Sequence, residues 1–263
     1  MNLDWIHVNV LEFQYFLLIF SRLATMIALS PLLGSGSVPA MAKIGLSFLL
    51  SVIIFPFTAG AFPPIPDGIV PFVLMMVRES MLGVLIGLIG LAVFAGIQLS
   101  GQIFGMQIGF GIVNVIDPMS EEQVSVLGQF EFLIALLIFI AMDGHHLLIL
   151  AIANSYRYVP LDSFHVSQPF TREVVGLLQK TFIIAFKVGV PMIACLLVVT
   201  VAMGLIARTV PQMNIFIVGL PLNIMVGLFM LGVSMAFITY VMRGYFHDMF
   251  RDMIIMFRMA GGT

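Results

Sequence analysis

The chain has 263 residues, of which 61% are hydrophobic and only 9% charged, and its formal net charge is −2 at pH 7. A soluble domain is about a quarter charged because it needs a polar surface to cover its core. The composition therefore excludes an ordinary soluble protein and indicates an integral membrane protein, or a subunit buried in an assembly, and without a basic block nucleic acid is not an expected partner.

Six apolar segments follow one another along the chain, and a helix needs about 20 apolar residues to cross a bilayer. The first basic residue is Arg22, inside the first segment, so a cleavable signal peptide is not expected. Prolines and glycines interrupt the chain between segments. The sequence predicts an all-α, polytopic helical membrane protein. The approximate bounds of the segments are 11–33, 40–57, 71–109, 124–141, 177–206 and 215–242.

The third segment is too long for a bilayer. No charged residue occurs from Ser80 to Ile116, and a helix of that length measures roughly 55 Å, against a hydrocarbon core of about 30 Å. It either projects beyond the membrane or breaks near a glycine. Gly101 and Gly105, with Gly109 four residues further on, have the spacing that lets two helix backbones approach closely. Gly101 and Gly105 are therefore predicted helix-packing positions.

The stretch GFGIVNVIDPMSEEQ, residues 109–123, interrupts the apolar pattern at the end of this segment. Glycines open it, a short run rich in β-branched residues fills it, and Asp117-Pro118 ends the run. Glycine permits sharp backbone turns, and proline stops helices. An external surface loop and a part that folds inward are both compatible with this pattern.

The motif DGHH follows the fourth segment and raises the question of a metal site. Asp143, His145 and His146 are metal-ligating residue types, but adjacent histidines point in different directions on a helix, and no second His or Cys cluster completes a site. A polar helix end at the membrane surface is expected instead, with no metal. Zinc-protease, hydrolase-elbow and phosphate-loop motifs are also missing, so neither catalysis nor a cofactor is expected.

The last two apolar segments are separated only by ARTVPQMN, residues 207–214. Such a short link predicts a tight antiparallel helical hairpin. The tail that follows, RGYFHDMFRDMIIMFRMAGGT, mixes charged and apolar residues. It is expected to form an amphipathic end that lies at an interface.

Charged residues inside apolar segments are costly, so each is a candidate for a functional contact. Arg78 and Glu79 are chain neighbours and cannot pair face to face on one helix, so their partners must lie on other helices or other chains. No internal repeat typical of secondary transporters is visible, which favours inter-helix or inter-subunit contacts over a substrate relay. A secondary transporter with Arg22 and Lys187 in its pathway is the alternative from another class. The charged residues concerned are Arg22, Arg78, Glu79, Glu131, Lys187 and Arg208.

Two stretches carry a resemblance to a known family, namely DGHHLLILAIANSYRYVPL, residues 143–161, and IARTVPQMNIFIVGLPLNIMVGL, residues 206–228. Over essentially its whole length the chain resembles the FliR family of flagellar biosynthetic proteins, and the PQMNIF hairpin is the most specific part of the likeness. The resemblance implies about six long, tilted or broken helices. It also implies a FliP-like part at residues 1–160 and a FliQ-like hairpin with an amphipathic tail at residues 161–263.

The resemblance implies a role without catalysis, in the export gate of a type III secretion apparatus. One FliR-like chain would join FliP-like and FliQ-like membrane subunits to complete a helical channel for unfolded export substrates, with an FlhB-type switch protein packed against it. The expected location is the bacterial inner membrane, in contact with the lipid bilayer and within the flagellar basal body. The equivalent subunit of a virulence type III secretion system is the alternative.

The resemblance also assigns roles to residues. The stretch 109–123 is expected to plug the closed channel, and Arg208, beside the hairpin turn, is the preferred contact with neighbouring subunits. The apolar residues expected to seal the plug are Ile112, Val113, Val115 and Ile116. The core of the predicted plug loop is Gly109, Phe110, Gly111, Ile112, Val113, Asn114, Val115, Ile116, Asp117 and Pro118. The predicted subunit contacts are Arg78, Glu79, Lys187 and Arg208.

Overall fold

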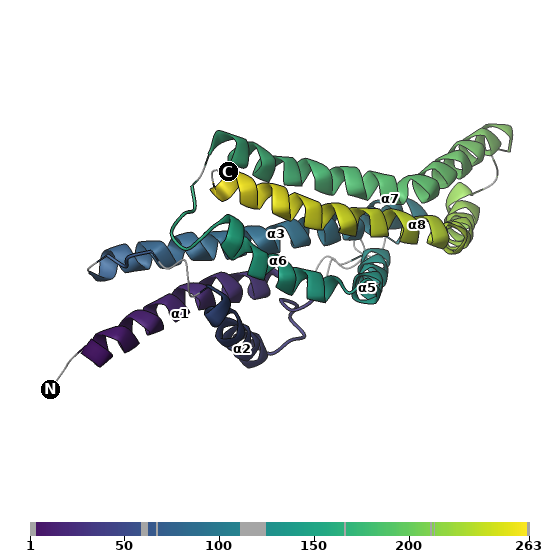
Figure 1. Ribbon diagram of the computed structural model, residues 1–263. Coiled ribbons are helices and arrows are strands. Elements are labelled where there is room, and N and C mark those ends of the chain that lie inside the picture. The colour runs from purple at the N-terminus through teal and green to yellow at the C-terminus, as the bar shows by residue number, and fades with distance from the viewer. Residues whose placement is uncertain are drawn as a thin grey trace. The chain divides into compact units, whose positions relative to one another are not determined.

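The computed structural model describes residues 4–58, 63–66, 68–110, 125–165, 167–210, 212 and 214–261. All regular secondary structure in these residues is helical (Figure 1), which confirms the predicted all-α fold class. The helices are α1 (Asp4–Leu29), α2 (Ala40–Thr58), α3 (Ile69–Ile108), α5 (Val126–Ala141), α6 (Gly144–Tyr158), α7 (Gln168–Thr209) and α8 (Ile215–Gly261).

Helices α3, α7 and α8 contain 40, 42 and 47 residues without interruption. Helix α3 does not break at its glycines, so at about 1.5 Å per residue it extends well beyond a hydrocarbon core of about 30 Å. Within the described residues, 5 helices are long and apolar enough to cross a membrane, or 6 if α5 and α6 form one bent span. The six predicted segments agree with this finding, and the chain is a multi-pass membrane protein.

The chain divides into two compact units that draw on segments from both sides of residue 160. Unit 1 consists of Met1–Ala92, Asp143–Leu177 and Asp248–Thr263, and unit 2 of Val93–Met142 and Leu178–His247. The predicted division at residue 160 concerns likeness to two other families rather than compactness. It stays a prediction.

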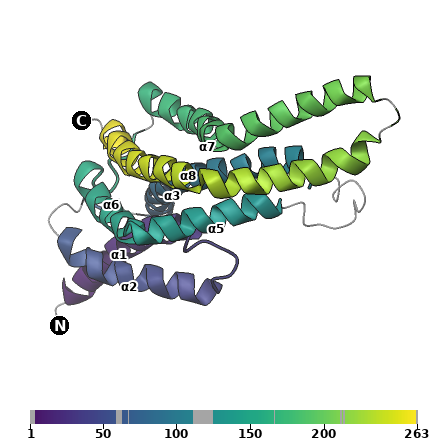
Figure 2. The same ribbon diagram turned by 90° about the vertical axis from the view of Figure 1, so that its right-hand side faces the viewer.

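In unit 1, helix α1 packs closely on the first half of α3 and lies beside α2 (Figure 2). A Cβ added at Gly83 would collide with the backbone of Arg22, and one added at Gly87 would meet the Cβ of Leu29. The hydroxyl of Thr25 donates to the carbonyl of Ser80 at 3.1 Å. Small residues on α3 therefore let the two backbones touch, as is common between helices in membranes.

The C-terminal end of α8, from Asp248 onward, belongs to unit 1. Its amphipathic pattern is as predicted, with buried side chains at Met249, Met253 and Phe257. The amide of His165 donates to the carbonyl of Ala260 at 3.2 Å. One apolar face of the tail is thus covered by protein, and its expected position at an interface stays a prediction.

In unit 2, an aromatic cluster joins α3, α5 and α8. The ring of Phe94 lies 5.6 Å from that of Phe132, 5.5 Å from that of Phe139 and 5.2 Å from that of Phe246, measured between centroids. These separations fall in the range in which aromatic pairs attract one another. The cluster holds the three helices together within unit 2.

The predicted hairpin of α7 and α8 is confirmed. In Figure 1 the two helices run side by side in opposite directions. Lys187 on α7 lies over the ring of Tyr245 on α8, 5.9 Å from its centroid. Further along, a Cβ added at Gly227 would lie 3.6 Å from Leu196. Residue numbers rise on one helix as they fall on the other, as an antiparallel pair requires.

Candidate functional site

A buried ion pair between Arg22 of α1 and Glu79 of α3 lies at the centre of unit 1. The Nε of Arg22 donates to Oε2 of Glu79 at 2.7 Å, and both side chains are completely buried. Opposite charges at this separation attract strongly where water is excluded, although removing both from water is costly. A pair like this is stable only when further hydrogen bonds satisfy its remaining atoms.

Helix α6 and the residue after it supply those bonds. Nη1 of Arg22 donates to the hydroxyl of Ser155 at 2.9 Å and to the carbonyl of Val159 at 3.2 Å, and Nη2 donates to the same carbonyl at 3.2 Å. The guanidinium also lies 4.1 Å from the ring centroid of Tyr156, a cation–π contact. Arg22 is therefore fully engaged inside the protein, which argues against its predicted alternative place in a transport pathway.

The loop after α6 is tied to α3 through Glu79 and its neighbour. Oε1 of Glu79 accepts a hydrogen bond from the amide of Asp162 at 3.1 Å. Nη1 of Arg78 donates to Oδ1 of Asp162 at 2.7 Å, with the side chains 50% and 33% exposed. Arg78 and Glu79 therefore have partners on other elements of the same chain, which was one of the two predicted possibilities, and they share Asp162. The carboxylate of Glu79 is therefore satisfied within the chain, and its predicted contact with another subunit stays a prediction.

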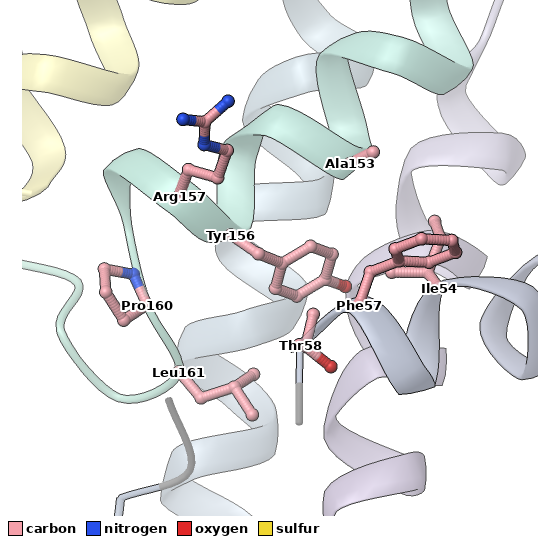
Figure 3. Close-up of a pocket in the computed structure, with 8 residues that line it drawn as sticks. All are labelled: Ile54, Phe57, Thr58, Ala153, Tyr156, Arg157, Pro160 and Leu161. Atoms are coloured by element: carbon pink, nitrogen blue, oxygen red, sulfur yellow. The ribbon is translucent and has the colours of Figure 1, made fainter. Parts of the chain in front are cut away.

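A cavity of about 410 Å³ lies beside this network in unit 1 (Figure 3). The ring of Tyr156 forms one wall and points towards Phe57 and Thr58 of α2, whereas the guanidinium of Arg157 points away. Tyr156 therefore contributes to both the cavity and the Arg22 contact. The lining residues are Ile54, Phe57, Thr58, Ala153, Tyr156, Arg157, Pro160 and Leu161. The wall is mainly apolar, and it offers no arrangement of nucleophile and base.

In unit 2, helix α3 ends where the predicted plug loop begins. Gly109 has φ +111°, a left-handed conformation that favours glycine. The amide of Phe110 donates to the carbonyl of Gly105 at 3.2 Å, which satisfies a carbonyl at the helix end. Residues 111–124 lie outside the described part of the chain, so the predicted plug from Gly111 to Pro118, with its seal, stays a prediction.

The residues that flank this segment meet at the same end of α3. Phe110 bonds to the backbone of Gly105, and a Cβ added at Gly105 would lie 2.8 Å from the hydroxyl oxygen of Ser125. Ser125 precedes α5, and its hydroxyl accepts from the amide of Gly128 at 3.4 Å as an N-cap. Phe110 and Ser125, the described residues on either side of the segment, therefore both lie against Gly105.

The backbones of helices α3 and α5 are in close contact at Gly101. A Cβ added there would lie 2.6 Å from the Cα of Gly128 and 2.7 Å from the carbonyl oxygen of Leu127. Both of these atoms belong to the backbone, so neither can rotate aside. Glycine at this position is required by the contact between the two helices, and Gly105 lies one turn further along the same contact.

A buried acid lies in the same helix contact. Glu131 is completely buried, and its carboxyl group lies against Ser100 and the backbone of Gly101. Among the described residues, neither of its oxygens has a hydrogen bond of ordinary geometry. A buried carboxyl without a cationic partner is costly when ionised. The sequence identified Glu131 as a charged residue inside an apolar segment, but it did not predict that the carboxyl group would be buried between α3 and α5.

The two remaining predicted contact residues lie on α7 and are both exposed. Lys187 is in the middle of the helix, over Tyr245. Arg208 is in the last turn, where a cation also interacts favourably with the helix dipole. The exposed positions make both side chains accessible to another subunit.

The structure corrects one expectation about DGHH. The side chains of Asp143, His145 and His146 do not diverge, because a ligand atom of each lies within 4.8 Å of the others. The ring centroids of the two histidines are 4.2 Å apart. Asp143 adopts a left-handed conformation before α6, with φ 55° and ψ 28°, so the helical geometry assumed from the sequence does not apply to it.

Sequence reasoning missed several members of the Arg22 network. Ser155, Tyr156, Val159 and Asp162 all contact Arg22 or Glu79, but they lie in or just after an ordinary amphipathic helix. The only available signal was the presence of two charges in apolar segments. That signal predicts partners on other elements without identifying them.

Comparisons with known proteins agree over most of the chain. The family of bacterial export proteins, family 1, matches residues 13–249. The flagellar biosynthetic protein FliR of Bacillus subtilis is 38% identical over 237 residues, which cover 89% of this chain and 91% of that protein. FliR of Aquifex aeolicus is 28% identical over 89% of this chain and 90% of that protein. FliR of Escherichia coli is 28% identical over 87% of each.

Proposed function

The chain belongs to family 1 of the bacterial export proteins, within its group of flagellar FliR proteins, and from this membership we propose that it is a subunit of the flagellar type III export gate. It joins FliP-like and FliQ-like subunits, completes a helical channel for unfolded flagellar proteins and performs no catalysis. An FlhB-type switch protein packs against the assembly. The gate lies in the bacterial inner membrane, within the flagellar basal body.

An exposed apolar band along α7 is the structural observation that carries the subunit role. From Val175 to Ile206 a helix rises about 46 Å, whereas a hydrocarbon core is about 30 Å thick. In an upright helix, lipid alone therefore covers about two thirds of the band, and neighbouring helices must cover the rest. The band consists of Val175, Leu178, Phe182, Ile183, Phe186, Val190, Leu197, Val198, Val201, Leu205 and Ile206.

The flagellar form of the gate is favoured over the virulence form. Each of the relatives described above is named as a flagellar biosynthetic protein. The secondary-transporter alternative loses support, because the guanidinium of Arg22 donates its hydrogen bonds to Glu79, Ser155 and Val159 inside the protein. A gate subunit needs no free charge in a substrate pathway.

The plug role rests on where the segment starts and ends. It leaves α3 after the left-handed Gly109 and returns at Ser125, close to Gly105. Its apolar residues Ile112, Val113, Val115 and Ile116 form the proposed seal, because a water-filled path is blocked most easily by side chains that exclude water.

Deleting Ile112 to Asp117 is expected to leave the gate assembled and to make it leak, because both anchors remain while the seal is lost. The measurement is dye or ion efflux from vesicles that contain the purified complex. The matched control replaces Glu121 and Glu122 with glutamine, in the same segment but outside the seal, and should not leak. Lost assembly without a leak would mean that the segment is structural.

Arg208→Glu is expected to lower the yield of the complex when the chain is co-expressed with its FliP-like and FliQ-like partners, because it reverses an exposed charge beside the hairpin turn. Arg208→Gln should reduce the yield less, since it removes the charge without reversing it. The control is Arg172→Glu, which reverses another exposed arginine near the start of α7. Equal yields for all three variants and the wild type would remove Arg208 from the proposed contacts.

A further inference from the structure

Three side chains of metal-ligating type gather at the start of α6. Asp143, His145 and His146 each offer one ligand atom, and these atoms all lie within 4.8 Å of one another. Nδ1 of His146 is 3.5 Å from Oδ1 of Asp143. Asp143 is the N-cap residue of the helix, yet its side chain makes no capping hydrogen bond. Its carboxylate is directed to the histidines instead of to the free amides of the first turn.

His145 supplies a second and independent observation. Its Nδ1 is buried, and among the described residues it has no hydrogen-bond partner. A buried polar atom normally finds a partner in the protein, in ordered water or in an ion. Its ring lies 4.2 Å from that of His146, with 40° between the planes. The two rings are therefore in contact, and one nitrogen of each lies within 4.8 Å of a carboxylate oxygen of Asp143.

The donor set determines which ions fit. Two imidazole nitrogens and one carboxylate oxygen suit zinc and its neighbours among the divalent transition metals, at bond lengths of about 2.0 to 2.2 Å. Magnesium and calcium prefer oxygen ligands in larger number. In tetrahedral coordination, bonds of that length place donor atoms about 3.3 Å apart. The ligand atoms, which lie within 4.8 Å of one another, must approach further by side-chain rotation to reach that spacing.

We propose that Asp143, His145 and His146 form a binding site for one divalent transition-metal ion, with Zn²⁺ as its reference ligand. The side chains of Asp143 and His146 are 77% and 71% exposed, so an ion enters directly from solvent. All three residues belong to one short segment of unit 1. The site is independent of the proposed channel role, and the ion would tie Asp143 to the first turn of α6.

The test is Zn²⁺ binding to the full-length chain, purified in detergent with a tag that contains no histidine. Competition with a chromogenic chelator should give one Zn²⁺ per chain. His145→Ala and His146→Ala should each lower the affinity for Zn²⁺ roughly tenfold or more. Even the loss of a residue that only hydrogen-bonds to a metal-binding side chain lowers metal affinity by about tenfold. Asp143→Asn should weaken it as well. The matched control is His247→Ala, an exposed histidine on α8, which should leave binding unchanged.

A second measurement does not depend on how the variants fold. X-ray absorption of the Zn²⁺-loaded wild type should show two imidazole nitrogens among the ligands. The proposal is overturned if the wild type binds no Zn²⁺, if His247→Ala weakens binding as much as His145→Ala, or if a different number of imidazoles is found. Displacement of Zn²⁺ by a moderate excess of Mg²⁺ would also overturn it, because it would indicate a site made of oxygens alone.

Discussion

Arg22→Met is expected to lower the free energy of unfolding by about 3–5 kcal/mol, because it leaves Glu79 as an unpaired charge in the interior. Both side chains are completely buried, and Arg22 also bonds to Ser155 and Val159. A loss of that size should lower the Tm of the detergent-solubilised chain by roughly 6 to 20 °C. Glu79→Leu alone should have a similar effect, since it leaves the guanidinium of Arg22 buried without its ionic partner.

The double variant Arg22→Met/Glu79→Leu separates the ion pair from ordinary packing. Replacing both charges by apolar side chains of similar size is often nearly neutral, so the double variant should recover most of the lost Tm. Arg78→Met is the matched control, because its pair with Asp162 is half exposed and should contribute only about 0–1 kcal/mol. A double variant as unstable as the two single changes combined would contradict a coupled pair.

The amino-acid sequence predicted the helical segments well for a simple physical reason. Membrane helices need long uninterrupted apolar runs, and a run is a local property that can be read without knowing any contact. The partners of Arg22 are not local. Glu79 is 57 positions away, Ser155 is 133 away and Val159 is 137 away. Composition identifies a buried charge as costly, but it cannot select its partner from several helices.

The glycines of helix α3 show a second limit on what can be predicted from the sequence. Its glycines were compatible with either a break or close packing, because glycine permits both. The structure resolves the choice through neighbouring backbone, with α1 against Gly83 and Gly87, and α5 against Gly101. DGHH is a further case, because the sequence did not show that one ligand atom of each of Asp143, His145 and His146 would lie within 4.8 Å of the others.

Gly101→Ala should destabilise the chain by about 1–3 kcal/mol, the usual cost of overpacking an interior. The new Cβ would lie 2.6 Å from the Cα of Gly128 and 2.7 Å from its amide nitrogen. Because these are backbone atoms, α3 and α5 must separate for the methyl group to fit. Thermal unfolding of the detergent-solubilised chain measures the loss. Gly105→Ala should cost less, because the hydroxyl of Ser125 that it approaches can rotate away.

The control is Gly244→Ala, which should stabilise the chain instead of destabilising it. Gly244 lies inside α8, and a Cβ added there meets nothing within 4 Å. Alanine is favoured over glycine in a helix by about 1 kcal/mol, so Gly244→Ala should raise the Tm slightly. Alanine is also favoured over glycine at Gly101, so the free-energy cost of the backbone collision must exceed this gain for the variant to be less stable. If Gly101→Ala were as stable as Gly244→Ala, the close contact of α3 and α5 would be absent, and Gly105 and Ser125 would no longer hold the two ends of the proposed plug together.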